Sequence, residues 1–121
     1  MKLLLIILGV ITALYILSLL YLVLSVGRFT SYWKDGEAQS APKNALVYVA
    51  LGDSAAQGVG ATLPTKGYVG EFAKRLEQKH GRPVQIINLS ESGARIQDVI
   101  KDQIPLLKNY KADVITLDIG G

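Results

Sequence analysis

Cysteine is absent from the 121 residues of the sequence. This absence excludes disulfides, thiolate metal sites and a cysteine nucleophile within these residues, although it does not decide between the cytoplasm and the exterior. Histidine occurs once, as His80, beside Gly81 at the end of a predicted helix. A cation suits the negative end of the helix dipole. We therefore expect His80 to lie at the surface and to take no part in catalysis.

Charge of one sign is not concentrated anywhere along the chain. The net charge of +3 comes from 13 basic and 10 acidic residues, and no block of lysine and arginine exceeds two neighbours. Aromatic residues are not interleaved with the basic ones. A mixed, solvated surface explains this pattern better than a nucleic-acid interface, so we expect no nucleic-acid partner.

A long apolar run is present at the beginning of the chain. Residues 3–26 contain no charge, and as a helix they would be about 36 Å long, enough to cross a hydrocarbon core of about 30 Å. Phe29, Tyr32 and Trp33 follow at the level of an interfacial aromatic belt. The run therefore predicts a transmembrane signal-anchor helix over residues 1–26, which holds the protein to a membrane by a single pass.

A cleaved signal peptide is the alternative for this segment. Small residues in Ser25-Val26-Gly27 have the spacing of a cleavage site, but the apolar region of a signal peptide is usually about 7 to 15 residues long. We favour an uncleaved anchor on this length. The flanking positive charges do not favour export, yet we expect an extracytoplasmic domain because single N-terminal spans commonly serve as export anchors. Polar residues over 27–44 predict a linker.

Beyond residue 44, strand-like and helix-like segments alternate. Continuous apolar runs indicate strands covered on both faces, and apolar residues at every third or fourth position indicate helices. Pro105 is expected to kink or restart the second helix. Strands joined by helices predict a flavodoxin-like, doubly wound parallel α/β sheet with the first strand between the second and third. The expected strands cover residues 45–51, 84–89 and 113–119, and the expected helices cover 68–80 and 96–108.

Three loops are expected to meet at one edge of this sheet, because the carboxyl ends of parallel strands all lie at the same edge. Ligands of such sheets bind at that edge. The three loops are Gly52-Asp53-Ser54, residues 90–95 and Gly120-Gly121. A serine at a strand end is held in place, with backbone N–H groups near a developing oxyanion, but it needs a base to become nucleophilic. From these three residues alone, Asp53 and Ser54 are better explained as caps of the following turn.

The flanking residues carry a resemblance to a known family. Leu51-Gly52-Asp53-Ser54, followed by Gly58-Val59-Gly60-Ala61 and Gly67-Tyr68-Val69, resembles the first block of SGNH/GDSL hydrolases. Residues 88–94, Asn-Leu-Ser-Glu-Ser-Gly-Ala, resemble the second block, and residues 113–121 resemble the strand that leads into the third block, Gly-x-Asn-Asp. Three blocks in the family's order cover residues 45–121, the hydrolase domain that we expect.

The resemblance implies a serine esterase with Ser54 as the nucleophile. The N–H groups of Ser54 and Gly93 would form the oxyanion hole, and Gly52 and Asp53 would support the nucleophile turn. The substrate would be a small-molecule, lipid or carbohydrate ester, and the acyl and alcohol groups stay open. Acyl transfer by a serine needs neither a metal nor an organic cofactor.

The family pattern also includes groups that these residues do not supply. The resemblance implies an asparagine two residues after Gly120, as a third oxyanion donor, and a later Asp-x-x-His with the general base and its aspartate. We therefore expect the domain to be incomplete at its C-terminal side, and the 121 residues alone to be inactive. Poor solubility is also expected, because the third strand would have an unpaired apolar edge.

Other function classes fit the sequence less well or stay open. A nucleotide-binding loop is suggested by Gly58-x-Gly60, but Leu63 stands where the third glycine of that motif is needed. The nucleophile elbow of another α/β-hydrolase class would need glycine in place of Ala56. A catalytically inactive, membrane-tethered binding module of the same fold stays open, because a fold does not determine a function.

Overall fold

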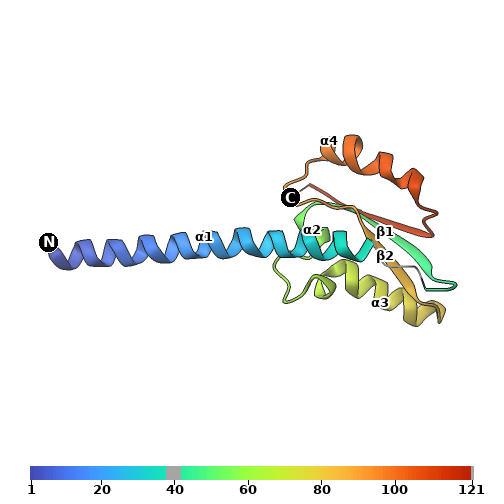
Figure 1. The fold of residues 1–121 in the computed structure, drawn as a ribbon, viewed down its shortest axis with the longest axis horizontal. Coiled ribbons are helices and arrows are strands. Elements are labelled where there is room, and N and C mark those ends of the chain that lie inside the picture. Colours follow the sequence, from blue (N-terminus) through green and yellow to red (C-terminus); the bar gives the residue numbers. More distant parts are fainter. Residues whose placement is uncertain (38–41, 121) are drawn as a thin grey trace.

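The computed structural model describes residues 1–37 and 42–120, as a long helix joined to a small α/β domain (Figure 1). The long helix, α1, covers Lys2–Glu37. The strands are β1 (Leu46–Gly52), β2 (Val84–Asn88) and β3 (Val114–Asp118). The helical segments of the domain are α2 (Ser54–Gln57), η1 (Pro64–Lys66), α3 (Tyr68–His80), α4 (Ile96–Asp98), η2 (Val99–Gln103) and η3 (Ile104–Asn109).

The three strands form one parallel sheet in the order β2-β1-β3. Leu46 of β1 is paired with Val84 of β2, and Gly52 of β1 is paired with Asp118 of β3. The parallel α/β sheet with the first strand in the middle is therefore confirmed. All three carboxyl ends lie at one edge, as crossovers between parallel strands require.

Both faces of β1 are buried, which explains its continuous apolar run. Side chains alternate along a strand, so Tyr48 and Ala50 face one side of the sheet and Val49 and Leu51 face the other. The first pair packs with α3 and with Trp33 of α1, and the second packs with β2 and η3. The central strand thus takes part in two apolar clusters.

The segment after β2 is not one regular helix. It changes from the single α-turn of α4 to the wide turn of η2, in which Ile104 N–H donates to the carbonyl of Val99, and then to the 3₁₀ turns of η3. Pro105 lies in the first turn of η3 and has no N–H to donate. The expected interruption at Pro105 is confirmed, and the helix type changes around it.

Helix α1 continues beyond the end that the sequence suggested. The linker expected over 27–44 is helical as far as Glu37, and this part of the prediction is wrong. Phe29 and Trp33, four residues apart and hence on one helix face, are 0% and 6% exposed. Their burial stabilises a helix that composition alone does not predict. Because these two side chains are buried, they do not form the expected interfacial aromatic belt. Residues 38–41 of the expected linker lie outside the described residues.

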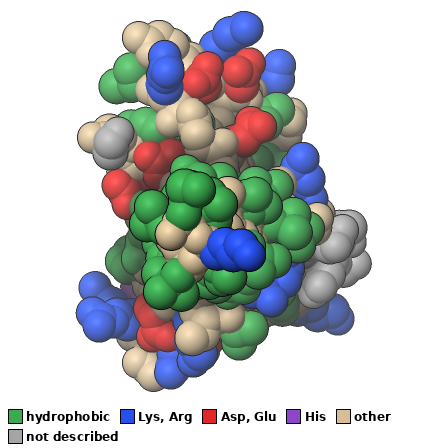
Figure 2. Space-filling view, turned by 90° about the vertical axis from the view of Figure 1, so that its left-hand side faces the viewer, with side chains coloured by type: hydrophobic (Ala, Val, Ile, Leu, Met, Phe, Trp, Pro, Cys, Tyr) green, Lys and Arg blue, Asp and Glu red, His purple; other side chains and the backbone are tan. Residues whose placement is uncertain are grey.

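The first part of α1 has the opposite environment. Within the described ranges, Lys2–Lys34 is the one helix long and apolar enough to cross a membrane by length and composition, and its most apolar window of 18 residues has a mean hydropathy of 2.8. None of its most apolar window is buried against the domain. Figure 2, which views the molecule along this helix, shows its hydrophobic side chains projecting from the domain. This helix is a candidate membrane span or signal sequence.

Candidate active site

Ser54 begins α2, directly after β1, and its side chain is partly exposed at the carboxyl edge of the sheet. Asp53 is the N-cap of this short helix, and its Oδ1 accepts a hydrogen bond of 2.9 Å from the N–H of Ala55. The helix ends after one turn, at Gly58 with φ 81°. Asp53 therefore caps the turn on which Ser54 stands.

Gly52 is required where the chain leaves β1. Its φ is 141°, which L side chains rarely adopt, and a Cβ atom built there would collide with the backbone oxygen of Asp118. The N–H of Asp53 donates to the same oxygen at 3.3 Å. The turn that carries Ser54 thus lies directly against the end of β3, and this contact is the physical reason for the glycine.

The side chain of Gln103 holds Gly52 through two hydrogen bonds. Its Oε1 accepts from the Gly52 N–H at 2.9 Å, and its Nε2 donates to the Gly52 carbonyl at 2.8 Å. The side chain is 3% exposed, so both bonds form away from water. Sequence reasoning missed Gln103. The sequence did contain one indication of its role: Gln103 is a polar residue on the apolar face of the expected helix, four positions from both Val99 and Leu107.

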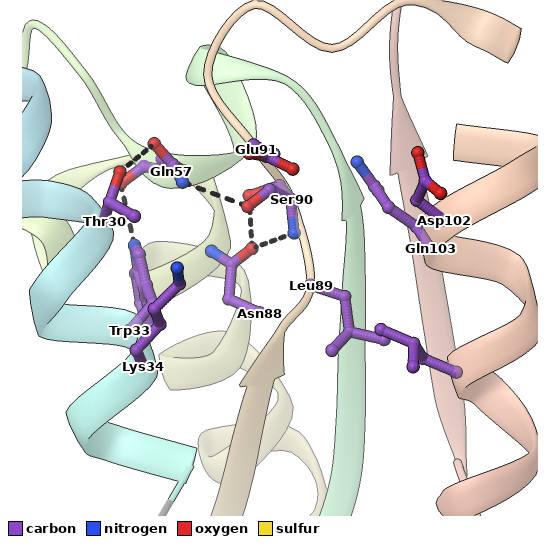
Figure 3. A pocket seen from close by; sticks show the side chains of 11 residues that line it. Thr30, Trp33, Lys34, Gln57, Asn88, Leu89, Ser90, Glu91, Asp102 and Gln103 are labelled. Carbon is purple, nitrogen blue, oxygen red and sulfur yellow. Dashed lines mark hydrogen bonds between the residues drawn. The ribbon is translucent and has the colours of Figure 1, made fainter. Parts of the chain in front are cut away.

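Gln57, at the end of α2, connects three separate segments (Figure 3). Its Nε2 donates to the carbonyl of Ser90 at 3.0 Å, and its Oε1 accepts from the hydroxyls of Thr30 and Ser92 at 3.3 and 2.6 Å. Its backbone carbonyl accepts from the indole N–H of Trp33 at 2.9 Å. Gln57 therefore connects α1 and the loop after β2 to the turn that carries Ser54. No periodicity indicates this residue, because α2 is a single turn.

Asn88 joins the end of β2 to α2. Its Nδ2 donates to the carbonyl of Ala56 at 2.8 Å, and its Oδ1 accepts from the backbone N–H of Ser90 at 3.1 Å and from the Ser90 hydroxyl. Asn88 and Ser90 are both buried. Their bonds fix the start of the loop over 89–94 relative to the turn that carries Ser54.

Gly93 lies in this loop, in an exposed turn with φ 82°. The N–H of Glu91 donates to the Gly52 carbonyl at 3.1 Å, and the N–H of Ala94 closes the turn on Glu91. The three loops singled out in the sequence therefore meet at one edge, since Gly120 follows the end of β3 beside Gly52.

His80 lies at the other edge of the sheet. It is the last residue of α3 and is exposed. The chain continues from there to Pro83, whose carbonyl accepts from the N–H of Leu46 at the amino end of β1. The expected surface position of His80 is confirmed. Over the described ranges, no group of three or more His, Cys, Asp or Glu side chains could hold a metal ion.

A cavity of about 220 Å³ lies beside Gln57, between the end of α1 and η2 (Figure 3). Thr30, Trp33 and Lys34 line it from α1, opposite Asp102 and Gln103. Ser54 is not among its lining residues. This cavity separates α1 from η2 and does not form a substrate pocket around the serine.

Two tyrosines below this edge resist ionisation. Burial raises the pKa of Tyr48 to about 12, and its hydroxyl lies 2.8 Å from that of Thr116. Burial also raises the pKa of Tyr68, and the negative charges of Asp118 and Asp53 act in the same direction. Both phenols therefore stay neutral at physiological pH, so they can donate hydrogen bonds.

In a comparison with known protein families, residues 50–121 match the model of the GDSL-like lipase/acylhydrolase family. These residues include Ser54, the loop with Gly93 and the end of β3. The chain is also 33% identical over 75 residues to a protein named spore germination lipase LipC, from Bacillus licheniformis. The matched segment covers 60% of this chain but 35% of that relative. No solved structure matches the chain significantly.

Proposed function

The chain belongs to the GDSL-like lipase/acylhydrolase family, and we propose from this premise that it is part of a membrane-anchored serine esterase with Ser54 as the nucleophile. One observation carries the proposal. Ser54 stands on a turn held by Gln57 and Gln103 at the ligand-binding edge of the sheet. A turn whose backbone is fixed in this way supports the proposal, because a fixed turn lowers the cost of orienting a hydroxyl for attack.

The proposed reaction is ester hydrolysis in two steps. Ser54 Oγ attacks the ester carbonyl carbon while its proton passes to a general base, and the N–H groups of Ser54 and Gly93 stabilise the oxyanion. The alcohol leaves with a proton and Ser54 stays acylated. Water then releases the carboxylic acid and regenerates the hydroxyl. Each oxyanion donor is worth about 2.7 to 4 kcal/mol in comparable sites.

The general base is proposed to come from residues outside 1–121. Within the described part of the chain, the one imidazole lies at the opposite edge of the sheet from Ser54. The family resemblance implies an Asp-x-x-His and an asparagine donor that follow Gly121. We therefore propose that the 121 residues alone do not hydrolyse esters, and that activity belongs to the complete protein.

The anchor is proposed to be α1, uncleaved, with the domain on the extracytoplasmic side. The candidate cleavage site at residues 25–27 lies within continuous helix, two residues before the buried Phe29. A helix that continues into the domain core is better suited to anchoring than to removal. The uncharged run over 3–26 supplies the membrane-spanning length.

Ser54→Ala in the complete protein tests the assignment. Hydrolysis of short-chain soluble esters should fall by a factor of about 10³ or more in kcat/KM, because removal of an activated nucleophile has such effects in serine hydrolases. Ser31→Ala, at an exposed position of α1, is the matched control and should leave the rate unchanged. Activity that survives Ser54→Ala would sink the assignment and favour another nucleophile. An inactive wild type that binds ester-bearing lipids or sugars would favour the tethered binding module.

A further inference from the structure

We propose that the edge of the sheet with Ser54 faces the bilayer that holds α1, and that the substrate is an acyl ester carried by a lipid of that membrane. This inference rests on the proposed function, both for the anchor and for the nucleophile. It adds a substrate class and an interaction surface, the layer of lipid headgroups. Four observations support it: the rigid junction, the short distance, the direction of the sheet and the polar character of the exposed face.

The junction between helix and domain is rigid. Helix α1 runs without interruption from Lys2 to Glu37. Phe29 and Trp33 are buried in the domain, and Thr30 and Trp33 bond to Gln57. A helix that is part of the domain's core transmits its own orientation in the membrane to the domain. The carboxyl edge of the sheet is therefore held at a fixed depth relative to the membrane, which a flexible linker would not achieve.

The distance from the apolar run to the nucleophile turn is short. Thr30 and Trp33 follow Val26 by four and seven residues, which corresponds to about 6 and 10 Å along a helix axis. The headgroup layer of one leaflet is about 5 to 8 Å thick, given a bilayer of about 40 to 45 Å and a hydrocarbon core of about 30 Å. Gln57 and Ser54 belong to the same helical turn. Ser54 is thus held close to headgroup depth.

The sheet points towards the membrane side. In Figure 1, the carboxyl ends of the strands and α2 lie on the side of the domain nearer the N-terminus of α1, and the end of α3 lies on the far side. Strand β1 has seven residues, which span about 20 Å at about 3.3 Å per residue. The two edges of the domain therefore differ in depth by much more than a headgroup layer.

The face seen from the membrane side is suited to headgroups and not to hydrocarbon. Figure 2 shows acidic and basic side chains around the apolar helix on this face. Arg28 is exposed directly after the apolar run, where lipid phosphates lie. Charged groups of both signs stay hydrated at this level, so the domain rests on the bilayer without insertion. The ester carbonyls of acyl lipids lie just below, at the boundary of the hydrocarbon.

Depth measurements test the orientation without any need for activity. Residues 1–121 contain no cysteine, so single spin labels can be placed by Glu91→Cys at the proposed membrane-facing edge and Lys79→Cys at the far edge, in a background without other cysteines. Both positions are exposed. In phosphatidylcholine vesicles, the label at 91 should be shielded from a water-soluble relaxation agent and the label at 79 fully accessible. Equal accessibility, or the reverse order, overturns the proposal.

A spacer tests the substrate class. Seven helix-forming polar residues inserted between Val26 and Gly27 would raise the domain by about 10 Å and turn it by about 20° from two full turns. In vesicles, hydrolysis of an acyl lipid in the same bilayer should fall about tenfold or more, with the rate on a soluble short-chain ester within about twofold of wild type. The same insertion before Leu3, on the far side of the membrane, is the matched control.

The outcomes separate this inference from the proposed function. If the spacer lowers both rates equally, or neither rate, the membrane-facing substrate is wrong and Ser54 still stands as the nucleophile. If Ser54→Ala leaves both rates unchanged, the proposed function fails first, and the substrate class fails with it. Selective loss on the bilayer substrate, together with a shielded label at position 91, supports the inference.

Discussion

The middle of the sheet and its carboxyl edge both contain buried side chains, but different forces hold these side chains in place. The middle is apolar: Val49 and Ala50 of β1 are fully buried among other hydrocarbon groups. The edge contains the four buried polar residues of the described part, Gln57, Asn88, Ser90 and Gln103. Within that same part, no buried side-chain nitrogen or oxygen lacks a partner.

This difference separates stability from positioning. Apolar contacts are non-directional, so side chains of similar volume can replace one another at modest cost. Hydrogen bonds to Gly52 and Ser90 specify the position of one peptide or one loop, and a buried group that loses its partner costs about 1 to 3 kcal/mol. At the edge that carries Ser54, single substitutions of polar residues should therefore displace the backbone around Ser54 more than substitutions elsewhere in the domain would.

The largest effect is expected for Gly52→Ala. The new Cβ atom would collide with the backbone of Asp118 at a φ of 141°, so the end of β1 must move away from β3. We expect the free energy of unfolding to fall by about 3 kcal/mol or more, and esterase activity to be lost. Urea unfolding of the complete protein in detergent measures the change. Gly60→Ala is the control for positive φ alone, since nothing lies within 4 Å of a Cβ there. Equal losses at both positions would contradict the collision argument.

Gln103→Met tests the edge by removing two buried hydrogen bonds at nearly constant volume. The N–H and carbonyl of Gly52 lose this partner, so stability should fall by about 2 to 4 kcal/mol, and kcat should fall even in the fraction that stays folded. Unfolding curves and kinetics at one temperature measure both quantities.

Val49→Ala supplies the comparison from the middle of the sheet. It should cost about 2 kcal/mol through lost burial and a cavity, with kcat per folded molecule unchanged. Gln97→Met, at an exposed position of α4, controls for the methionine itself. If Val49→Ala and Gln103→Met lower kcat equally, the proposed separation of stability from positioning is wrong.

The smallest effect is expected from Tyr48→Phe, in the apolar middle. The variant loses the hydroxyl contact with Thr116, which should cost about 1 kcal/mol at neutral pH. Because the folded pKa of Tyr48 is raised to about 12, the stability that it contributes is complete below an unfolded pKa of about 10 and is lost as pH rises towards 12. Wild type should therefore lose its advantage over the variant between pH 10 and 12. If the unfolding free energies of wild type and variant change in parallel across that range, the raised pKa of Tyr48 is wrong.

Local patterning predicted the elements of the domain well. The bounds of α3 agree with the expected 68–80, and each strand differs from its expected range by one residue at either end or not at all. The continuous apolar run of β1 predicted a strand covered on both faces, and the flavodoxin-like strand order predicted its central place. The glycine and serine at its end were recognised by a family resemblance and by the topology that gathers strand ends at one edge.

The polar network could not be predicted in the same way. Gln57 and Gln103 act on backbone groups of Ser90 and Gly52, and those partners are distant in sequence. A glutamine in a short turn has no periodic context, and a single polar residue in an apolar stripe does not identify its partner. Their roles depend on which peptide lies opposite in the folded chain.

The sequence by itself determined the parallel sheet and the edge at which Ser54 stands, because these follow from local patterning and from parallel crossovers. The strand order followed from the flavodoxin-like pattern. Only the tertiary structure decided that α1 continues into the domain and that its last turns hold the nucleophile turn. The physical reason lies in Phe29 and Trp33. Their burial stabilises helix over a polar segment, and the cluster that buries Trp33 is assembled from residues far away in the sequence.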